Sequence, residues 1–120
     1  MKNHPIEFNC PVEATLQLIG GKYKAVILWH LIKSKKRFSE LRRLLPKVTE
    51  KMLTQQLRDL EKNGLVIRTV YPVIPPKVEY SLSEFGRSII PVLDAMCNWG
   101  ADYLTSIPGS PACCSGNKTE

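Results

Sequence analysis

A run of basic and amide side chains in the middle of the chain recurs at the spacing of one helix face. Its members are Lys51, Gln55, Arg58 and Lys62. Lysine and arginine neutralise phosphates or hydrogen-bond guanine, and glutamine can pair with adenine in a DNA major groove. The opposite face carries Leu53, Leu57 and Leu60, the stripe that a helix buries. A helix with one buried side and one basic, amide-bearing side is expected to act as a recognition helix.

Three shorter helices should precede this one and hold it in place. The first is expected to begin at Cys10-Pro11, because proline suits the first turn, and to end at Gly20-Gly21. The second should cover residues 22–34. The third should cover residues 39–46, with Ser39 as its cap.

A hairpin and a last helix should follow. Apolar and polar residues alternate over 65–82, and the prolines of 72–76 suit an exposed hairpin tip. The last helix should run from Ser83-Glu84 to about Leu104, with a kink at Pro91. The predicted class is mostly α with a small β-hairpin.

The composition is that of one soluble domain. The chain has 120 residues, of which 43% are hydrophobic and 23% charged. No apolar run approaches the ~20 residues of a membrane span, and the first residues do not form a secretory signal. A cytoplasmic protein with no membrane partner is therefore expected, with its four cysteines mostly reduced. Residues 1–105 should form the domain and 106–120 a flexible tail.

Charge is concentrated in the middle of the chain. Residues 22–87 hold fifteen Lys and Arg against six Asp and Glu, whereas the whole chain carries +6. A solvated basic surface would be the plainer explanation. The concentration around the helix and hairpin favours a polyanion-binding surface instead.

Four blocks of sequence, in order, resemble the HxlR-type winged helix-turn-helix transcriptional regulators of bacteria. They are CPVEATLQLIGGKYKAVIL (10–28), FSELRRLLPKVTEKMLTQQLRDLEKNGLVIR (38–68), PPKVEYSLSEFG (75–86) and PVLDAMCNWG (91–100). The resemblance implies a homodimer, held by its first and last helices, that binds double-stranded operator DNA near promoters. It also implies that residues 49–63 enter the major groove and that the loop around Ile74 to Lys77 forms the wing. Tyr23 stands where the family usually has Trp.

Candidate DNA contacts follow from the basic face and from this resemblance. They are Arg42, Arg43, Lys47, Thr49, Lys51, Thr54, Gln55, Arg58, Arg68 and Lys77. Lys51 and Arg58 are the strongest candidates for base contacts. Two helices of a twofold dimer should lie ~34 Å apart and read an inverted repeat. The candidate dimer contacts are Leu16, Ile89, Leu93, Met96 and Trp99.

Cys10 is a candidate redox sensor. The start of a helix favours a thiolate, although Glu13 opposes it. In some members of the resembling family a cysteine at this Cys-Pro position senses oxidants or electrophiles. A small buried apolar side chain is the equal alternative. Cys97 is expected to serve in packing, and Cys113-Cys114 are too close together for a metal site, so no metal or cofactor is expected.

Other classes of function remain as alternatives. The same DNA-binding dimer could answer to a small-molecule ligand instead of an oxidant. A thiol-redox protein or enzyme would need a base near Cys10, but the sequence shows no Cys/His arrangement, Gly-rich phosphate loop or HExxH motif, so an enzyme is not expected. The charged face of the predicted recognition helix argues against a protein-interaction module, because the cores of protein–protein interfaces are depleted in charged residues.

Overall fold

The computed structural model describes residues 10–108. They fall into two compact units, the first ending at Arg87 and the second beginning at Ser88. The first unit contains five helices and a small sheet, and the second contains one long helix, among the described residues.

The four helices expected before the hairpin are present. They are α1 (Pro11–Ile19), α2 (Lys24–Leu31), α3 (Phe38–Leu44) and α4 (Glu50–Lys62). Cys10 is the N-cap of α1 and Pro11 its first residue, as expected, whereas α2 is shorter than predicted. The prediction that Ser39 caps α3 was wrong. The N-cap is Arg37, whose backbone N–H donates to the Glu40 carboxylate at 2.7 Å, so the helix begins one residue earlier.

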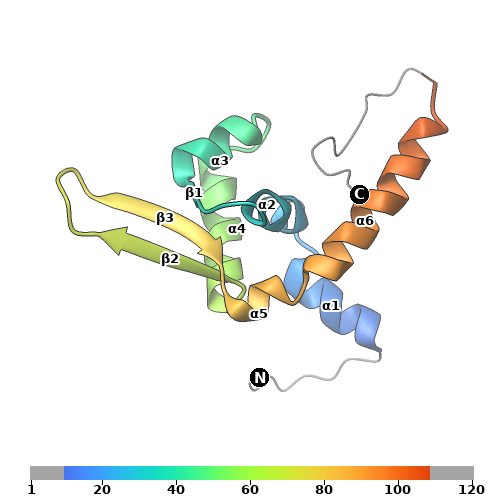
Figure 1. Cartoon of the computed structure of the whole chain (residues 1–120), viewed down its shortest axis with the longest axis horizontal. Helices are drawn as coiled ribbons and strands as arrows, with labels where there is room; N and C mark the ends of the chain where they lie inside the picture. The colour runs from blue at the N-terminus through green and yellow to red at the C-terminus, as the bar shows by residue number, and fades with distance from the viewer. Residues whose placement is uncertain (1–9, 109–120) are drawn as a thin grey trace. The chain divides into compact units, whose positions relative to one another are not determined.

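Three antiparallel strands form the sheet. They are β1 (Lys36–Arg37), β2 (Val66–Tyr71) and β3 (Lys77–Leu82), in the order β1-β3-β2. Within the predicted hairpin, Val66 pairs with Leu82 at the base and Tyr71 with Lys77 near the tip. Figure 1 shows β2 and β3 extending away from the helices as a long ribbon. The sequence did not predict β1, which is two residues long and pairs only with Glu79 and Tyr80.

The core of the first unit is built from leucine, isoleucine and valine side chains of α2, α3 and α4, of the turn between α3 and α4, and of the start of the hairpin. Its largest fully buried members are Ile27, Leu28, Leu41, Val48, Leu53, Leu57, Leu60 and Leu65. The predicted stripe on α4 is therefore confirmed, since all three of its leucines are buried. Gly64 has a φ of 82°, a left-handed conformation that lets the chain turn sharply from α4 into β2.

The prediction of a single last helix with a kink at Pro91 was wrong. The chain forms α5 (Glu84–Arg87), leaves the helix, and begins again as α6 (Ile90–Thr105), with Pro91 in the first turn. The Ser83 hydroxyl accepts the Gly86 N–H at 2.8 Å and caps α5. Proline in a first turn leaves no helical bond broken, which explains why the helix restarts there. Within residues 10–108, no helix is both long and apolar enough to cross a membrane.

Candidate nucleic-acid interface

Helix α4 starts from a well-formed cap. The Thr49 hydroxyl accepts the Met52 N–H at 3.0 Å, as the sequence predicted, and Glu50 lies in the first turn where the helix dipole favours an acid. Thr54 donates its hydroxyl proton to the Glu50 carbonyl at 2.8 Å. Both threonine hydroxyls are thus used inside the helix. Thr49 accepts and keeps its O–H proton for another partner, whereas Thr54 donates and keeps only its lone pairs.

The outer face of α4 offers unpaired positive charge. Lys51 and Arg58 are exposed, and in the described part of the chain neither makes an ion pair or hydrogen bond. Glu50, Thr54 and Gln55 complete the open depression that these two residues line. Three of the four residues predicted for this face, Lys51, Gln55 and Arg58, therefore line one surface, and Lys62 does not line it.

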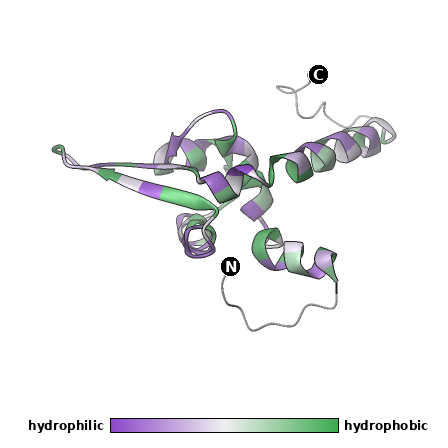
Figure 2. Cartoon of the chain, turned by 60° about the horizontal axis from the view of Figure 1, so that its bottom comes forward, coloured by the Kyte–Doolittle hydropathy of each residue, from purple (hydrophilic) through white to green (hydrophobic). Residues whose placement is uncertain are grey.

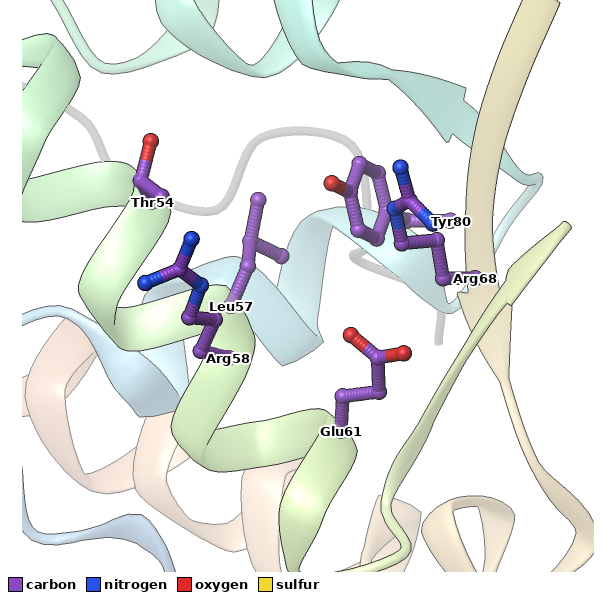
Figure 3. Close-up of a pocket in the computed structure, with 6 residues that line it drawn as sticks. All are labelled: Thr54, Leu57, Arg58, Glu61, Arg68 and Tyr80. Atoms are coloured by element: carbon purple, nitrogen blue, oxygen red, sulfur yellow. The ribbon is translucent and has the colours of Figure 1, made fainter. Parts of the chain in front are cut away.

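A second hollow joins α4 to the sheet (Figure 3). Its volume is about 360 Å³. The lining residues are Thr54, Leu57, Arg58 and Glu61 from α4, Arg68 from β2 and Tyr80 from β3. Because Arg58 lines both hollows, the basic surface continues from α4 to Arg68 on the hairpin. Sequence reasoning missed Glu61 and Tyr80, whose places depend on how the hairpin packs beside α4.

The other predicted hairpin contact, Lys77, is already engaged. Its ammonium lies 3.7 Å from a Glu79 carboxylate oxygen and 5.1 Å from the centre of the Tyr71 ring. Lys35 approaches the same carboxylate at 3.5 Å. The Tyr71 hydroxyl, followed by Lys77 and Lys35, holds the pKa of Glu79 below its usual value. Arg68 is consequently the freer cation of the hairpin.

The hairpin tip is apolar. Ile74 is 98% exposed, and Val73 beside it is half exposed. Figure 2 colours the outer end of the hairpin as hydrophobic. Val73 and Ile74 at the tip therefore add apolar surface and no charged group to the candidate interface.

Gln55 is not a free amide. Its NH₂ group donates to one oxygen of Asp59 at 3.1 Å, while the other oxygen of Asp59 lies 3.3 Å from the Lys24 ammonium on α2. A glutamine held in this way keeps its carbonyl oxygen and the second N–H of its amide for a base. Sequence reasoning missed Asp59, although its position four residues after Gln55 is a recognisable helical pair.

The remaining basic candidates lie on and after α3. Arg43 and Lys47 are exposed, whereas Arg42 is half-buried and its Nε has no hydrogen-bond acceptor among the described residues. Arg42 is thus only partly available at the surface.

The predicted dimer contacts divide by exposure. Leu16 on α1 is exposed, as are Met96 and Trp99 on α6, but Leu93 is buried and Ile89 half-buried. The exposed stripe on α6 is Val92, Met96, Trp99 and Tyr103. The Trp99 and Tyr103 rings stack with centroids 5.7 Å apart. Sequence reasoning missed Tyr103 and, on α1, the exposed Val12.

The two described cysteines differ. Cys10 is a free, exposed thiol at the start of α1, so the alternative of a buried packing residue is wrong. Cys97 is disulfide-bonded and is not the reduced packing residue that was expected. Cys113 and Cys114 lie outside the described residues. No group of three or more potential metal ligands occurs among residues 10–108.

Comparison with known proteins gives a consistent answer. Residues 18–108 match the family model described as HxlR-like helix-turn-helix. The chain is 57% identical over 103 residues to YtcD of Bacillus subtilis, an uncharacterised HTH-type transcriptional regulator, covering 86% of this chain and 82% of that protein. The oxidised form of the redox regulator HypR superposes with a TM-score of 0.75 at 55% identity, covering 78% of this chain and 96% of that one.

A more distant structure agrees in fold. The reduced form of the transcriptional regulator YodB from B. subtilis has a TM-score of 0.69 at 32% identity, covering 92% of this chain and all of that one. The matched relatives are transcriptional regulators, which are a non-enzymatic class. The fold is that of their winged helix-turn-helix, with α3 and α4 as the helix pair and β2–β3 as the wing. The chain is therefore a transcriptional regulator that belongs to the HxlR-like helix-turn-helix family of DNA-binding proteins.

Proposed function

We propose that the chain binds an inverted-repeat operator as a homodimer, with one α4 helix of each copy in the major groove. The observation that carries this proposal is the exposed, unpaired pair Lys51 and Arg58 on the face of α4 opposite its buried leucines. A face of this kind can reach base edges and phosphates while the buried stripe keeps the helix in place.

The hairpin extends the same surface. Arg58, Arg68 and Glu61 line one hollow, so a phosphate lying between helix and wing would meet two guanidinium groups and one carboxylate (Figure 3). Arg43, Lys47 and the N-terminus of α4 at Thr49 add further contacts to the DNA backbone. These groups position the helix, and the side chains of Lys51, Gln55 and Arg58 read the bases.

A second copy of the chain explains the exposed apolar residues. Aromatic and apolar side chains at spacings of four, three and four residues leave α6 with an unpartnered stripe that includes Met96 and Trp99. Leu16 on α1 is exposed as well. A homodimer that buries these residues and reads an inverted repeat would need its two α4 helices ~34 Å apart, one turn of DNA.

Oxidation of Cys10 controls binding in this proposal. The thiol is free and exposed at the N-cap of α1. Hydrogen peroxide would convert a cysteine thiol to a sulfenic acid and release water. The names of HypR, a redox regulator, and of diamide-treated YodB support this signal over a small-molecule ligand.

The decisive experiment titrates the protein against a DNA fragment carrying its own promoter, at several salt concentrations. The logarithm of the affinity should fall linearly with the logarithm of the salt concentration. Arg58→Ala should weaken binding by about five- to 150-fold, the usual range for a base-contacting arginine. Arg87→Ala, which removes the same charge at the end of α5, is the matched control and should bind nearly as wild type.

The same titration with and without hydrogen peroxide tests the signal. Wild type should change its affinity on oxidation, and Cys10→Ser, which keeps a good helix cap, should not. Binding that ignores peroxide in both proteins would point to a small-molecule effector. Binding with no salt dependence, or none at all, would leave the chain as a protein-interaction module.

A further inference from the structure

We propose that Ile74, at the tip of the β2–β3 hairpin, wedges into the minor groove beside each half-site and bends the operator DNA. The inference rests on the proposed function, since it assumes that α4 occupies the major groove. The observation that carries it is a run of five apolar residues, 72–76, all of them exposed. Within this run Ile74 is 98% exposed and Val73 is 50% exposed.

The tip has little capacity to read bases by hydrogen bonds. Three of its five residues are prolines, which lack a backbone N–H, and the Val73 N–H is already donated to the Tyr71 carbonyl at 2.8 Å. An exposed apolar run of this length marks a surface that contacts something else. Isoleucine and proline are among the side chains that DNA-bending proteins insert between base steps from the minor groove. The chemistry of the tip therefore suits a wedge.

Positive charge lies at the base of the tip. The Lys77 ammonium is 5.1 Å from the centre of the Tyr71 ring and 3.7 Å from a Glu79 carboxylate oxygen. Lys35 approaches the same carboxylate at 3.5 Å and donates to the Tyr71 hydroxyl at 3.5 Å. Two ammonium groups thus share one carboxylate, and this cluster keeps a net positive charge. A protein interface is depleted in lysine, whereas DNA offers phosphates on both sides of its minor groove, so DNA is the better partner.

The same cluster holds the tip in a fixed direction. The two strands stay paired as far as Tyr71 and Lys77, directly before and after the proline-rich run. Lys35 comes from the segment between α2 and β1, so its contacts tie the end of the hairpin to the rest of the first unit. The prolines restrict the backbone further. A tip that is already ordered loses little conformational entropy when it inserts between bases.

The hairpin is long enough to reach the neighbouring groove. Arg68 lines the hollow beside α4, and Ile74 follows it by six residues, which span up to ~20 Å. The centres of adjacent major and minor grooves lie about half a helical turn apart, ~17 Å along the axis. Figure 1 shows the hairpin extending away from α4. The tip therefore continues the surface proposed for DNA.

The test measures bending of a bound operator fragment by resonance energy transfer between dyes at its ends. Wild type should bend the DNA by at least about 20°, the low end for a minor-groove wedge. Ile74→Gln has a similar length but a polar end, so it should lose more than half of that bend. Ile74→Leu stays apolar and should keep it. Ile67→Gln makes the same change at an exposed position near the base of the hairpin and should bend DNA as wild type does.

A second readout is the base step beside each half-site. TA and CA/TG steps are the most easily kinked, so a wedge should select them. Selection from a randomised library with the full chain should enrich these steps about fivefold or more, the low end of what one base-pair change costs. Ile74→Gln should lose this enrichment and still select the same half-site sequence, because α4 is unchanged.

The outcomes distinguish this inference from the proposed function. A bound operator that is straight, or that Ile74→Gln bends as much as wild type, overturns the wedge and leaves the DNA-binding proposal standing. Dissociation of the dimer in Ile74→Gln, measured by sedimentation velocity, also overturns it and assigns the tip to a second copy. Failure of wild type to bind any sequence overturns both. Because the side chain is almost fully exposed, each Ile74 variant should melt at the wild-type temperature.

Discussion

Helices α4 and α6 present opposite chemistry to their surroundings. In α4 the apolar side chains are buried within the chain, with Leu53 and Leu60 at 0% exposure, and the outer face is basic. In α6 the exposed stripe is apolar and aromatic, and Trp99 is 71% exposed. Figure 2 shows hydrophobic and hydrophilic segments mixed along α6.

The difference teaches what each helix still lacks. The fold of a single chain already satisfies the apolar side of α4, so its unpaired cations are available to a polyanion. The apolar side chains of α6 gain free energy only when another surface removes them from water. In the proposed function, α4 therefore contacts DNA and α6 contacts a second copy of the chain.

The largest expected effect is on the buried side of α4. Leu57→Ala should lower the free energy of unfolding by about 2 to 5 kcal/mol, because it removes buried methyl groups and leaves a cavity. Urea unfolding measured at several protein concentrations gives the same loss at each. Met96→Ala on α6 should instead show a loss that depends on concentration. Equal, concentration-independent losses would remove the contrast between the two helices.

The next effect is on association through α6. Trp99→Lys should weaken the dimer about 30-fold or more, as expected when a central aromatic residue of an interface is lost. Sedimentation velocity over a range of concentrations measures the dissociation constant. Thr105→Lys adds the same charge at the end of α6 and off the stripe, so it should leave the dimer intact. A monomeric wild type would show that the stripe binds something else.

A smaller effect concerns how the two helices begin. Thr49→Ala should reduce stability by about 1 kcal/mol, because the Met52 N–H loses its acceptor. Thr49→Ser keeps the hydroxyl and should retain most of that stability in thermal unfolding. Helix α6 has no side-chain cap at Ile89, so it offers no equivalent substitution. An unchanged melting temperature in Thr49→Ala would mean that water replaces the cap without loss.

The smallest effect is a pH dependence from α2, which packs against α4. Burial, followed by the charge of Lys36, lowers the pKa of His30 below 6.5. Below pH 6.5 His30 is protonated in the unfolded chain but still neutral in the folded chain. The free energy of unfolding therefore decreases as the pH falls from 6.5 toward the folded pKa. Chemical unfolding between pH 7.5 and 5 should show the decline, and His30→Gln should flatten it. A slope that persists in His30→Gln would belong to other groups.

Local signals predicted much of the fold. The Thr49 cap, the leucine stripe of α4 and the hairpin are each encoded in a few neighbouring residues, and the structure confirms all three. Burial along β2 and β3 does not alternate as predicted. The two-residue strand β1 was missed because only its pairing with β3 defines it. The break before Pro91 was missed because proline fits a helix start as well as a kink.

The candidate site was predictable only in part. Helical spacing predicted that Lys51 and Arg58 share an exposed face. It could not predict that Lys24, on another helix, engages the carboxylate that holds Gln55. Nor could it predict that Leu93 is buried while Trp99 is exposed. Apolar residues occur on both sides of α6, and the sequence does not show which side packs against the rest of the chain.

The order of the sheet has one more consequence, which concerns aggregation. Strand β2 lies at the edge, where its outward N–H and C=O groups could pair with a strand of another molecule, and Ile67 and Val70 on it are exposed. Such edges are protected in natural proteins by charge and by proline. Arg68 sits between the two apolar residues, and the prolines that follow Tyr71 lack the N–H needed to extend a ladder past the tip. Besides the DNA contact proposed for it, Arg68 is therefore expected to disfavour pairing between the β2 edges of neighbouring molecules.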